Sequence, residues 1–175
     1  MAQINNILRY YAVYLNGVGY MGEASEVKLP DLKMKSEEFR GGGMDMGVYV
    51  DLGMDPLQAE FKMFSYDPDV LARFGRYGLA QSTPLTFRAH LMGQGGQVAT
   101  LKINMDVRLC EVTRDNWKAG SKTEVNYKCW VDFYEEFHNE RRVLLFDPLN
   151  FHRTIDGVDM MSSARLSLGL TTATQ

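Results

Sequence analysis

The chain has 175 residues, with 19 basic and 22 acidic side chains and a formal net charge of -3. Its 45% hydrophobic and 23% charged residues exclude disordered and collagen-like chains and predict one soluble globular domain over residues 1–175. The mildly acidic balance disfavours a protein that grips nucleic acid, but it is compatible with a surface along which DNA passes. No apolar run approaches the ~20 residues of a membrane-spanning helix, and residues 1–15 do not resemble a signal peptide. We therefore expect folding in a cytoplasm and no membrane insertion.

Short clusters of Gly, Asn and Asp divide the chain into segments rich in apolar residues. Such clusters favour the tight turns of β-hairpins. The expected fold class is mainly β, an antiparallel β-barrel or sandwich with one α-helix. The predicted turns lie at residues 16–17, 93–96, 138–140 and 156–157.

Residues 33–55 are expected to form a long extended loop, which contains three consecutive glycines and several methionines. Loops of this length are uncommon in compact domains and are usually functional. Flexible thioethers suit a surface that repacks on a partner, although these methionines could instead fold back onto the protein's own core. We predict that the loop contacts another subunit. The predicted contact residues are Arg40, Gly41, Gly42, Gly43, Met44, Met46 and Tyr49.

Residues 67–77 are predicted to form the helix. Asp67 is a good N-cap, Pro68 suits the first helical position, and Gly78 can end the helix. An apolar stripe is expected to pack on the subunit's own barrel, so that truncating its phenylalanine to alanine would cost about 3 to 5 kcal/mol. The stripe consists of Val70, Leu71, Phe74 and Tyr77.

Residues 101–109 and 123–133 alternate between apolar and polar side chains, which predicts two strands with one buried face each. The alternation breaks after Leu109, so we expect a bulge near Leu109 and Cys110. Phe133 is assigned to the buried face and Trp130 to the polar face. The polar faces are predicted to line the inner wall of an assembly or its subunit boundaries, with Lys102, Asp106, Lys128 and Asp132 as the candidate residues.

Catalytic chemistry is not indicated. The two cysteines lie in separate alternating segments and are interpreted as reduced, buried thiols. The three histidines lack metal-ligand spacing, and the Gly41–Gly43 run is not followed by the Lys of a phosphate-binding loop. We expect no catalytic residue, no metal site and no cofactor.

Several short motifs recur in a recognisable order over almost the whole chain. They are Leu29-Pro30-x-Leu32, Lys35, Glu38-Phe39-Arg40-Gly41-x-Gly43-Met44, Val50-Asp51-Leu52-Gly53, Asp156-Gly157-Val158-Asp159 and Gly169-Leu170. With this order and spacing, the sequence resembles the major tail tube protein of contractile-tailed bacteriophages, which is related to the inner tube proteins of bacteriocins and of type VI secretion. The pair Glu37-Glu38, the stretch Met44-Asp45-Met46 and a tail at residues 171–175, expected to be disordered, depart from the pattern.

The resemblance implies a structural subunit without enzymatic activity. Such subunits form hexameric rings that stack into a hollow conduit for DNA inside a contractile sheath. The implied partners are other copies of the chain, the tail sheath protein, the tape measure protein during assembly, and the baseplate and tail terminator proteins. DNA would pass through the lumen without specific binding. The implied location is the virion tail, after assembly in the cytoplasm of the bacterial host.

Two alternatives remain open from the sequence. The first is the inner tube of a bacteriocin or secretion-type contractile particle, which is chemically the same part in another machine. The second belongs to a different class, a monomeric β-barrel that binds a small ligand in its interior.

Overall fold

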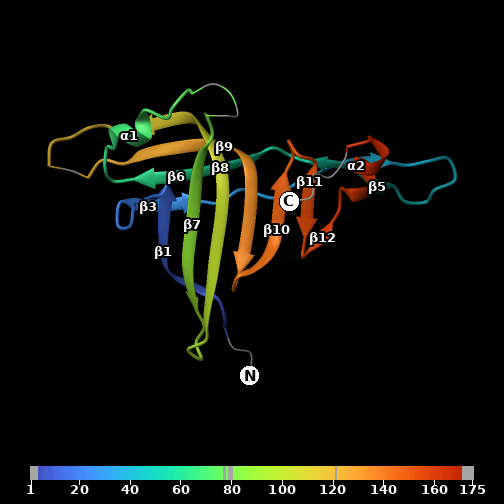
Figure 1. Ribbon diagram of the computed structural model, residues 1–175, viewed down its shortest axis with the longest axis horizontal. Helices are drawn as coiled ribbons and strands as arrows, with labels where there is room; N and C mark the ends of the chain where they lie inside the picture. The colour runs from blue at the N-terminus through green and yellow to red at the C-terminus, as the bar shows by residue number, and fades with distance from the viewer. Residues whose placement is uncertain (1–3, 77, 79–80, 121, 171–175) are drawn as a thin grey trace.

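Ten of the twelve strands belong to one antiparallel sheet in the computed structural model, which describes residues 4–76, 78, 81–120 and 122–170 (Figure 1). The main path of this sheet runs β12-β11-β10-β9-β8-β7-β1-β2, and β3 joins it through β6, which pairs with β9. The strands are β1 Ile7–Leu15, β2 Val18–Gly19, β3 Ala24–Lys28, β4 Met34–Phe39, β5 Val48–Met54, β6 Leu57–Met63, β7 Thr83–Met92, β8 Val98–Arg114, β9 Val125–His138, β10 Arg141–Asp147, β11 His152–Ile155 and β12 Val158–Asp159. The helices are α1 Pro68–Leu71 and α2 Ser162–Ser167. The mainly antiparallel β prediction is confirmed, but the described residues form two short helices where one was expected.

The two longest strands, β8 and β9, bend and contribute to two layers (Figure 1). The first half of β8 pairs with β7 in the first layer, while the first half of β9 pairs with β6 in the second. The shared register shifts between Asp106 and Val107 and again between Leu109 and Glu111. The second shift confirms the predicted bulge. Bulges bend strands, so these two irregularities let one sheet fold over itself.

The first of these shifts corrects the predicted face of Phe133. Asp106 lies opposite Phe133 and Val107 lies opposite Val131, so Asp132 is an extra residue in β9. Phe133 therefore shares a face with Asp106, and the next residue, Tyr134, points into the core. The bulge is followed by two aromatic residues, Phe133 and Tyr134, which point to opposite faces, so the apolar pattern alone did not reveal the change of phase.

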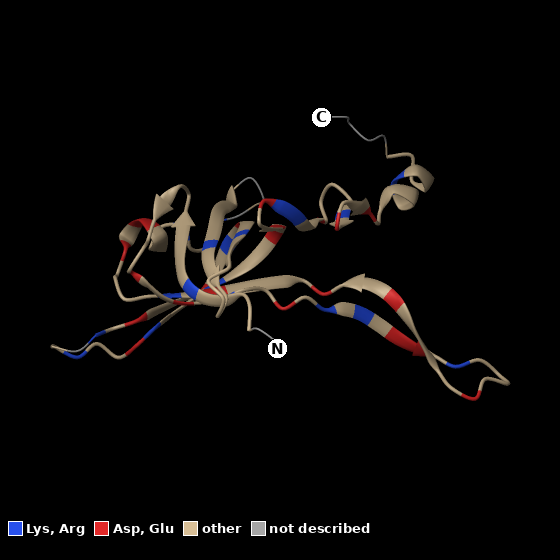
Figure 2. Ribbon diagram, turned by 90° about the horizontal axis from the view of Figure 1, so that it is seen from below, with Lys and Arg blue, Asp and Glu red and all other residues tan. Residues whose placement is uncertain are grey.

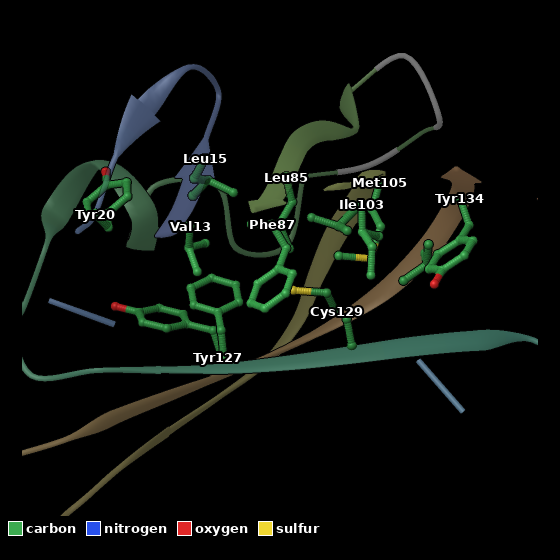
Figure 3. Close-up of a cluster of buried hydrophobic side chains, with 14 of the residues drawn as sticks. Val13, Leu15, Tyr20, Leu85, Phe87, Ile103, Met105, Tyr127, Cys129 and Tyr134 are labelled. Carbon is green, nitrogen blue, oxygen red and sulfur yellow. The ribbon is translucent and has the colours of Figure 1, made fainter. Parts of the chain in front are cut away.

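The core fills the space between the two layers with apolar side chains (Figure 3). The rings of Phe61 and Tyr127 stack with centroids 5.1 Å apart, and those of Tyr134 and Phe146 stack at 5.8 Å. Such contacts add to the free energy gained by removing each ring from water. The interior of the sandwich is thus a packed core.

The thiol of Cys129 lies in this core and that of Cys110 is half-buried; both are free. Burial raises the pKa of each thiol, most strongly that of Cys129. Because the thiolate is the reactive form, we expect Cys129 not to react with Ellman's reagent at pH 8 until the protein is unfolded. Rapid release of two equivalents of thionitrobenzoate from the folded protein would contradict this placement. Protein unfolded in guanidinium chloride, in which both thiols react, provides the reference value.

Helix α1 is a single turn, shorter than the predicted 67–77. The Asp67 N-cap is confirmed, since its Oδ1 accepts hydrogen bonds from the N–H groups of Asp69 at 2.7 Å and Val70 at 3.4 Å. The chain leaves the helical path at Gly75, whose φ of 71° is left-handed. The predicted stripe is correspondingly wrong: Val70 is fully buried, but Phe74 is 48% exposed. Tyr77 and the tail 171–175 lie outside the described residues.

This placement lowers the expected cost of truncating Phe74 and makes Val70 the residue whose truncation should cost more. Val70→Ala should lower the free energy of unfolding by about 2 kcal/mol, because two buried methyl groups are lost and a small cavity remains. Phe74→Ala should cost less than about 1 kcal/mol, because much of the ring already contacts water. Urea denaturation of both variants tests the ranking, and a larger loss for Phe74→Ala would support a longer packed helix.

Candidate assembly surfaces

The segment predicted as an extended loop, residues 33–55, is a two-stranded hairpin formed by β4 and β5. It makes a separate sheet and projects from one end of the molecule (Figure 2). Every residue of β4 is exposed, and so are the first five of β5. An isolated two-stranded hairpin is marginally stable in water. Its exposed apolar side chains are Met34, Phe39, Met46, Val48, Tyr49, Val50 and Leu52.

The tip of this hairpin is an ordered turn. The N–H of Gly41 contacts Sδ of Met44 at 3.1 Å, and the N–H of Met44 donates to the carbonyl of Gly41 at 3.2 Å. Arg40 Nε donates to the Met44 carbonyl at 3.2 Å, while Gly43 supplies the left-handed turn with a φ of 88°. Met44 is therefore half-buried against its own tip. Among the apolar side chains of the predicted contact residues, this leaves Met46 and Tyr49 exposed, at 76% and 78%.

The base of the hairpin is fixed to the body of the protein. Gly53 has a φ of 101° within an irregularity of the β4–β5 register, and its N–H donates to Asp51 Oδ1 at 2.7 Å. The N–H of Asp55 donates to the Lys33 carbonyl at 3.0 Å, and Arg153 lies 3.9 Å from Asp51. The hairpin thus leaves the body in a defined direction.

The outer side of the first layer carries a row of polar contacts across neighbouring strands. Thr86 Oγ1 donates to Asn104 Oδ1 at 3.3 Å, and Asn104 Nδ2 donates to Glu135 Oε2 at 3.2 Å. Arg142 continues the row with an ion pair to Glu135 at 3.4 Å. Lys102, one of the predicted lumen candidates, lies beside this row with its Nζ 5.4 Å from the centre of the Phe137 ring.

A second polar cluster lies where the two layers meet. Arg108 donates to both carboxylate oxygens of Asp132, at 2.6 and 2.8 Å, and its guanidinium lies over the Trp130 ring. Burial, together with the nearby carboxylates of Asp132 and Asp147, raises the pKa of Asp106. Trp130 is exposed, which confirms that it points away from the core.

The four lumen candidates are therefore spread over the bend. Lys102 and Asp106 belong to the first-layer half of β8, and Asp132 lies at the bulge. Lys128 belongs to the part of β9 that pairs with β6 in the second layer, and its Nζ is 3.9 Å from Glu111. Their assignment to an inner wall or a subunit boundary remains a prediction.

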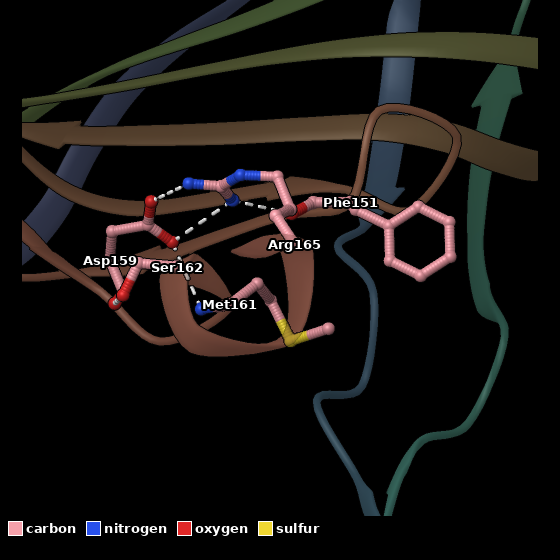
Figure 4. A network of polar contacts seen from close by, with 5 residues as sticks. All are labelled: Phe151, Asp159, Met161, Ser162 and Arg165. Carbon is pink, nitrogen blue, oxygen red and sulfur yellow. Dashed lines mark hydrogen bonds and ion pairs between the residues drawn. The ribbon is translucent and has the colours of Figure 1, made fainter. Parts of the chain in front are cut away.

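Sequence reasoning missed the C-terminal element that Arg165 holds in place (Figure 4). This side chain is buried, and its Nη1 donates to the Phe151 carbonyl at 2.7 Å. Its guanidinium also forms an ion pair with Asp159, which in turn accepts the N–H of Met161 at 2.9 Å. Helix α2 is thereby tied to the preceding turn while Leu166 and Leu168 stay exposed. The motif Asp156-Gly157-Val158-Asp159 contains the acidic partner of Arg165, so it could have indicated this ion pair.

A cavity of about 470 Å³ lies between the base of the β4–β5 hairpin and the C-terminal segment. Its lining is mostly apolar and includes Met54, Pro56, Val131, Phe146, Leu149 and Phe151. Four of its lining residues, Leu57, Val131, Tyr134 and Phe146, also belong to the hydrophobic core, so the cavity lies at one end of the core. Across the described part of the chain, no three His, Cys, Asp or Glu side chains gather in a way that could hold a metal ion.

None of the helices formed by the described residues is long and apolar enough to cross a membrane.

Comparison with known proteins identifies the class of protein that has this fold. Residues 5–169 match the phage tail tube protein FII family, and the chain belongs to that family. It is 26% identical to the tail tube protein of Escherichia phage P2 over 93% of this chain and 96% of that protein. It is 28% identical to the major tail tube protein of Serratia phage KSP20 over 93% and 95%, respectively.

Solved structures with the same fold come from contractile injection systems. A chain of the extended sheath–tube complex of the extracellular contractile injection system PVC superposes with a TM-score of 0.55 at 12% identity, over 73% of this chain and 88% of that one. A chain of the PVC sheath/tube terminator superposes with a TM-score of 0.52 at 11% identity, over 73% and 93%. The protein is thus a structural tail tube subunit of the virion tail, in a family of structural proteins.

Proposed function

We propose that this chain forms hexameric rings that stack into a tube, and that the β4–β5 hairpin makes the contacts between subunits. The observation that carries the proposal is the projecting hairpin, which forms a separate two-stranded sheet. Both of its strands carry exposed apolar side chains, and no second sheet formed by the described residues packs on them. A soluble subunit exposes such surface when another subunit covers it in the assembly. The contact residues predicted from the sequence, Arg40 to Met44 together with Met46 and Tyr49, lie in its tip and in β5.

The unpaired edges at the two ends of the main sheet support the proposal of a closed ring. Within the described residues, β1 pairs with β2 only at Tyr14 and Leu15, so residues 7–12 leave one edge without a strand partner. At the other end of the sheet, β12 pairs with β11 and with no other strand of the described part of the chain. Different surfaces at the two ends suit a heterologous contact, which closes into a ring when the rotation allows.

The tube would serve as a conduit for DNA inside a contractile sheath. Six chains of -3 give a formal ring charge of -18, which does not favour adhesion of DNA to the wall. The proposed lumen or boundary residues are Lys102, Asp106, Lys128 and Asp132. Within the subunit, Lys102 lies over the aromatic ring of Phe137. Lys128 and Asp132 form ion pairs with Glu111 and Arg108, respectively. The proposed partners are the sheath, baseplate, tail terminator and tape measure proteins, with assembly in the host cytoplasm.

Electron microscopy of the purified protein over a range of concentrations tests the assembly. We expect sixfold rings or hollow rods whose number rises with concentration. A monodisperse, compact monomer at all concentrations by small-angle scattering would instead support a monomeric protein. Isolation of the chain from particles with DNA-filled heads, rather than from headless particles, would distinguish a phage tail from a bacteriocin or secretion-type tube.

A further inference from the structure

The loop between β8 and β9 lies at the opposite end of the molecule from the β4–β5 hairpin (Figures 1 and 2). Strand β6 explains this separation. It begins at Leu57, just after the hairpin base, and runs the length of the second layer to Met63. The residues that follow β6 therefore lie beside the β8–β9 loop and far from the hairpin.

Three exposed aromatic side chains gather at this far end, and we call Phe64, Tyr66 and Trp117 the aromatic platform. The rings of Tyr66 and Trp117 meet edge to face with centroids 5.8 Å apart. Arg114 lies 5.8 Å from the Tyr66 ring centre, and Lys122 Nζ lies 5.3 Å from that of Phe64. Trp117 is 67% exposed. Exposed aromatic residues with flanking cations are typical of protein interfaces.

The hairpin has the complementary composition. Residues 34–54 carry four acidic and two basic side chains, whereas residues 114–124 carry three basic and two acidic ones. The hairpin also presents exposed apolar groups, of which Phe39, Met46 and Tyr49 are the largest or most exposed. Opposite charges guide and orient a contact, and burial of apolar surface supplies its free energy.

We propose that the β4–β5 hairpin of one subunit docks on the aromatic platform of a second copy of this chain. The two surfaces cannot meet within one subunit, because they project from opposite ends of it (Figure 1). A contact between two different surfaces of identical chains is heterologous and repeats from copy to copy, as a tube requires. This inference rests on the proposed function and adds to it the surface that receives the hairpin.

Site-specific photo-crosslinking in assembled tubes tests the docking. Trp117 is replaced by the photoreactive residue p-benzoylphenylalanine, which keeps an aromatic group at an exposed position. Tubes are assembled from a mixture of isotopically light and heavy protein, irradiated and digested. We expect crosslinked peptides that join position 117 to residues 34–54 of the other isotopic form. The same photoreactive residue at Tyr10, an exposed aromatic position on β1, is the matched control and should not link to residues 34–54.

The outcomes separate this inference from the proposed function. Tubes that form normally but link position 117 elsewhere, or to residues 34–54 of the same chain, would overturn the docking and leave the tube subunit intact. Failure of the wild-type protein to form any ring or tube would overturn both. Trp117→Ala and Trp117→Phe provide a second measurement: the first should lower tube yield at least about tenfold while the monomer stays folded, and the second should not. Equal, wild-type yields for both would also overturn the docking.

Discussion

Tyr49→Asp is expected to block tube assembly while leaving the monomer folded. The Tyr49 side chain is 78% exposed in the subunit, so the substitution removes little of the protein's own packing. In the proposed assembly it would instead place an unpaired carboxylate in an apolar contact, which costs several kcal/mol. The concentration needed for assembly should rise on the order of 100-fold, equivalent to about 2.7 kcal/mol per contact.

The measurement is a pelleting assay over a concentration series, combined with thermal unfolding of the monomer. Tyr49→Phe is the matched control, because it keeps the ring and should assemble like the wild type. The unfolding free energy of both variants should stay within about 0.5 kcal/mol of the wild-type value. Normal tubes from Tyr49→Asp would show that this side chain stays in water in the assembly. An unfolded Tyr49→Asp monomer would show that the hairpin belongs to the subunit's own core.

Arg165→Ala is expected to release the C-terminal segment from the body of the protein. The variant removes a buried guanidinium and leaves the Asp159 carboxylate and the Phe151 carbonyl without this donor. Because the Asp159 side chain is 32% exposed, the cost should be smaller than the loss of about 3 to 5 kcal/mol that follows removal of one partner from a fully buried ion pair. Because the contact ties residues 151–165 together, we expect the cost to appear as local unfolding of this segment. The core between the layers should keep its protection.

Limited proteolysis and amide exchange measure this release directly. Cleavage within residues 148–170 should accelerate in Arg165→Ala, while amides of β7 should exchange as in the wild type. Arg165→Lys is the graded control, because it keeps the charge but cannot contact Asp159 with two nitrogens. Its cleavage rate should therefore lie between those of the wild type and Arg165→Ala. Wild-type cleavage rates in Arg165→Ala would contradict the anchoring role.

The same ion pair predicts a dependence on pH. The hydrogen bond from Arg165 is the main cause that holds the pKa of Asp159 below its ordinary value of 3.8. A carboxylate with a lowered pKa stabilises the fold when it is ionised. Its contribution is thus complete at neutral pH and is lost as the pH falls below 3.8 towards the lowered pKa. Proteolytic release of the C-terminal segment should therefore appear on acidification in the wild type and should already be present at neutral pH in Arg165→Ala.

Local chemistry made the turns predictable from the sequence. Asn16 and Gly17 both adopt positive φ, of 50° and 80°, and Asp156 and Gly157 do so at 49° and 81°. These residue types tolerate left-handed backbone, so their position in the sequence already indicates a tight hairpin. The bulge after Leu109 was equally visible, because a polar residue occupies the next position where an apolar one is due.

Tertiary context decided what the sequence did not reveal. The hairpin at residues 34–54 has no buried face, so it lacks the alternation that marks a strand, and it was predicted as a loop. The other bulge, at Asp132, is followed by the aromatic pair Phe133 and Tyr134, so the sequence shows no break in apolar character there. Helix α2 is short and its buried residue is an arginine, so the usual apolar periodicity is absent. The aromatic platform combines residues 64 and 66 with residue 117, and only the fold brings them together.

Amide hydrogen exchange of residues 34–54, compared between the monomer and assembled tubes, tests most directly whether this hairpin makes the contacts of the tube. In the monomer these amides should exchange fast, because the hairpin is a two-stranded sheet exposed on both faces. In tubes they should become protected by at least about tenfold, while the amides of β7, which already pair on both sides, should change little as the internal reference. Tubes in which residues 34–54 exchange as fast as in the monomer would contradict the proposal that the hairpin joins the subunits.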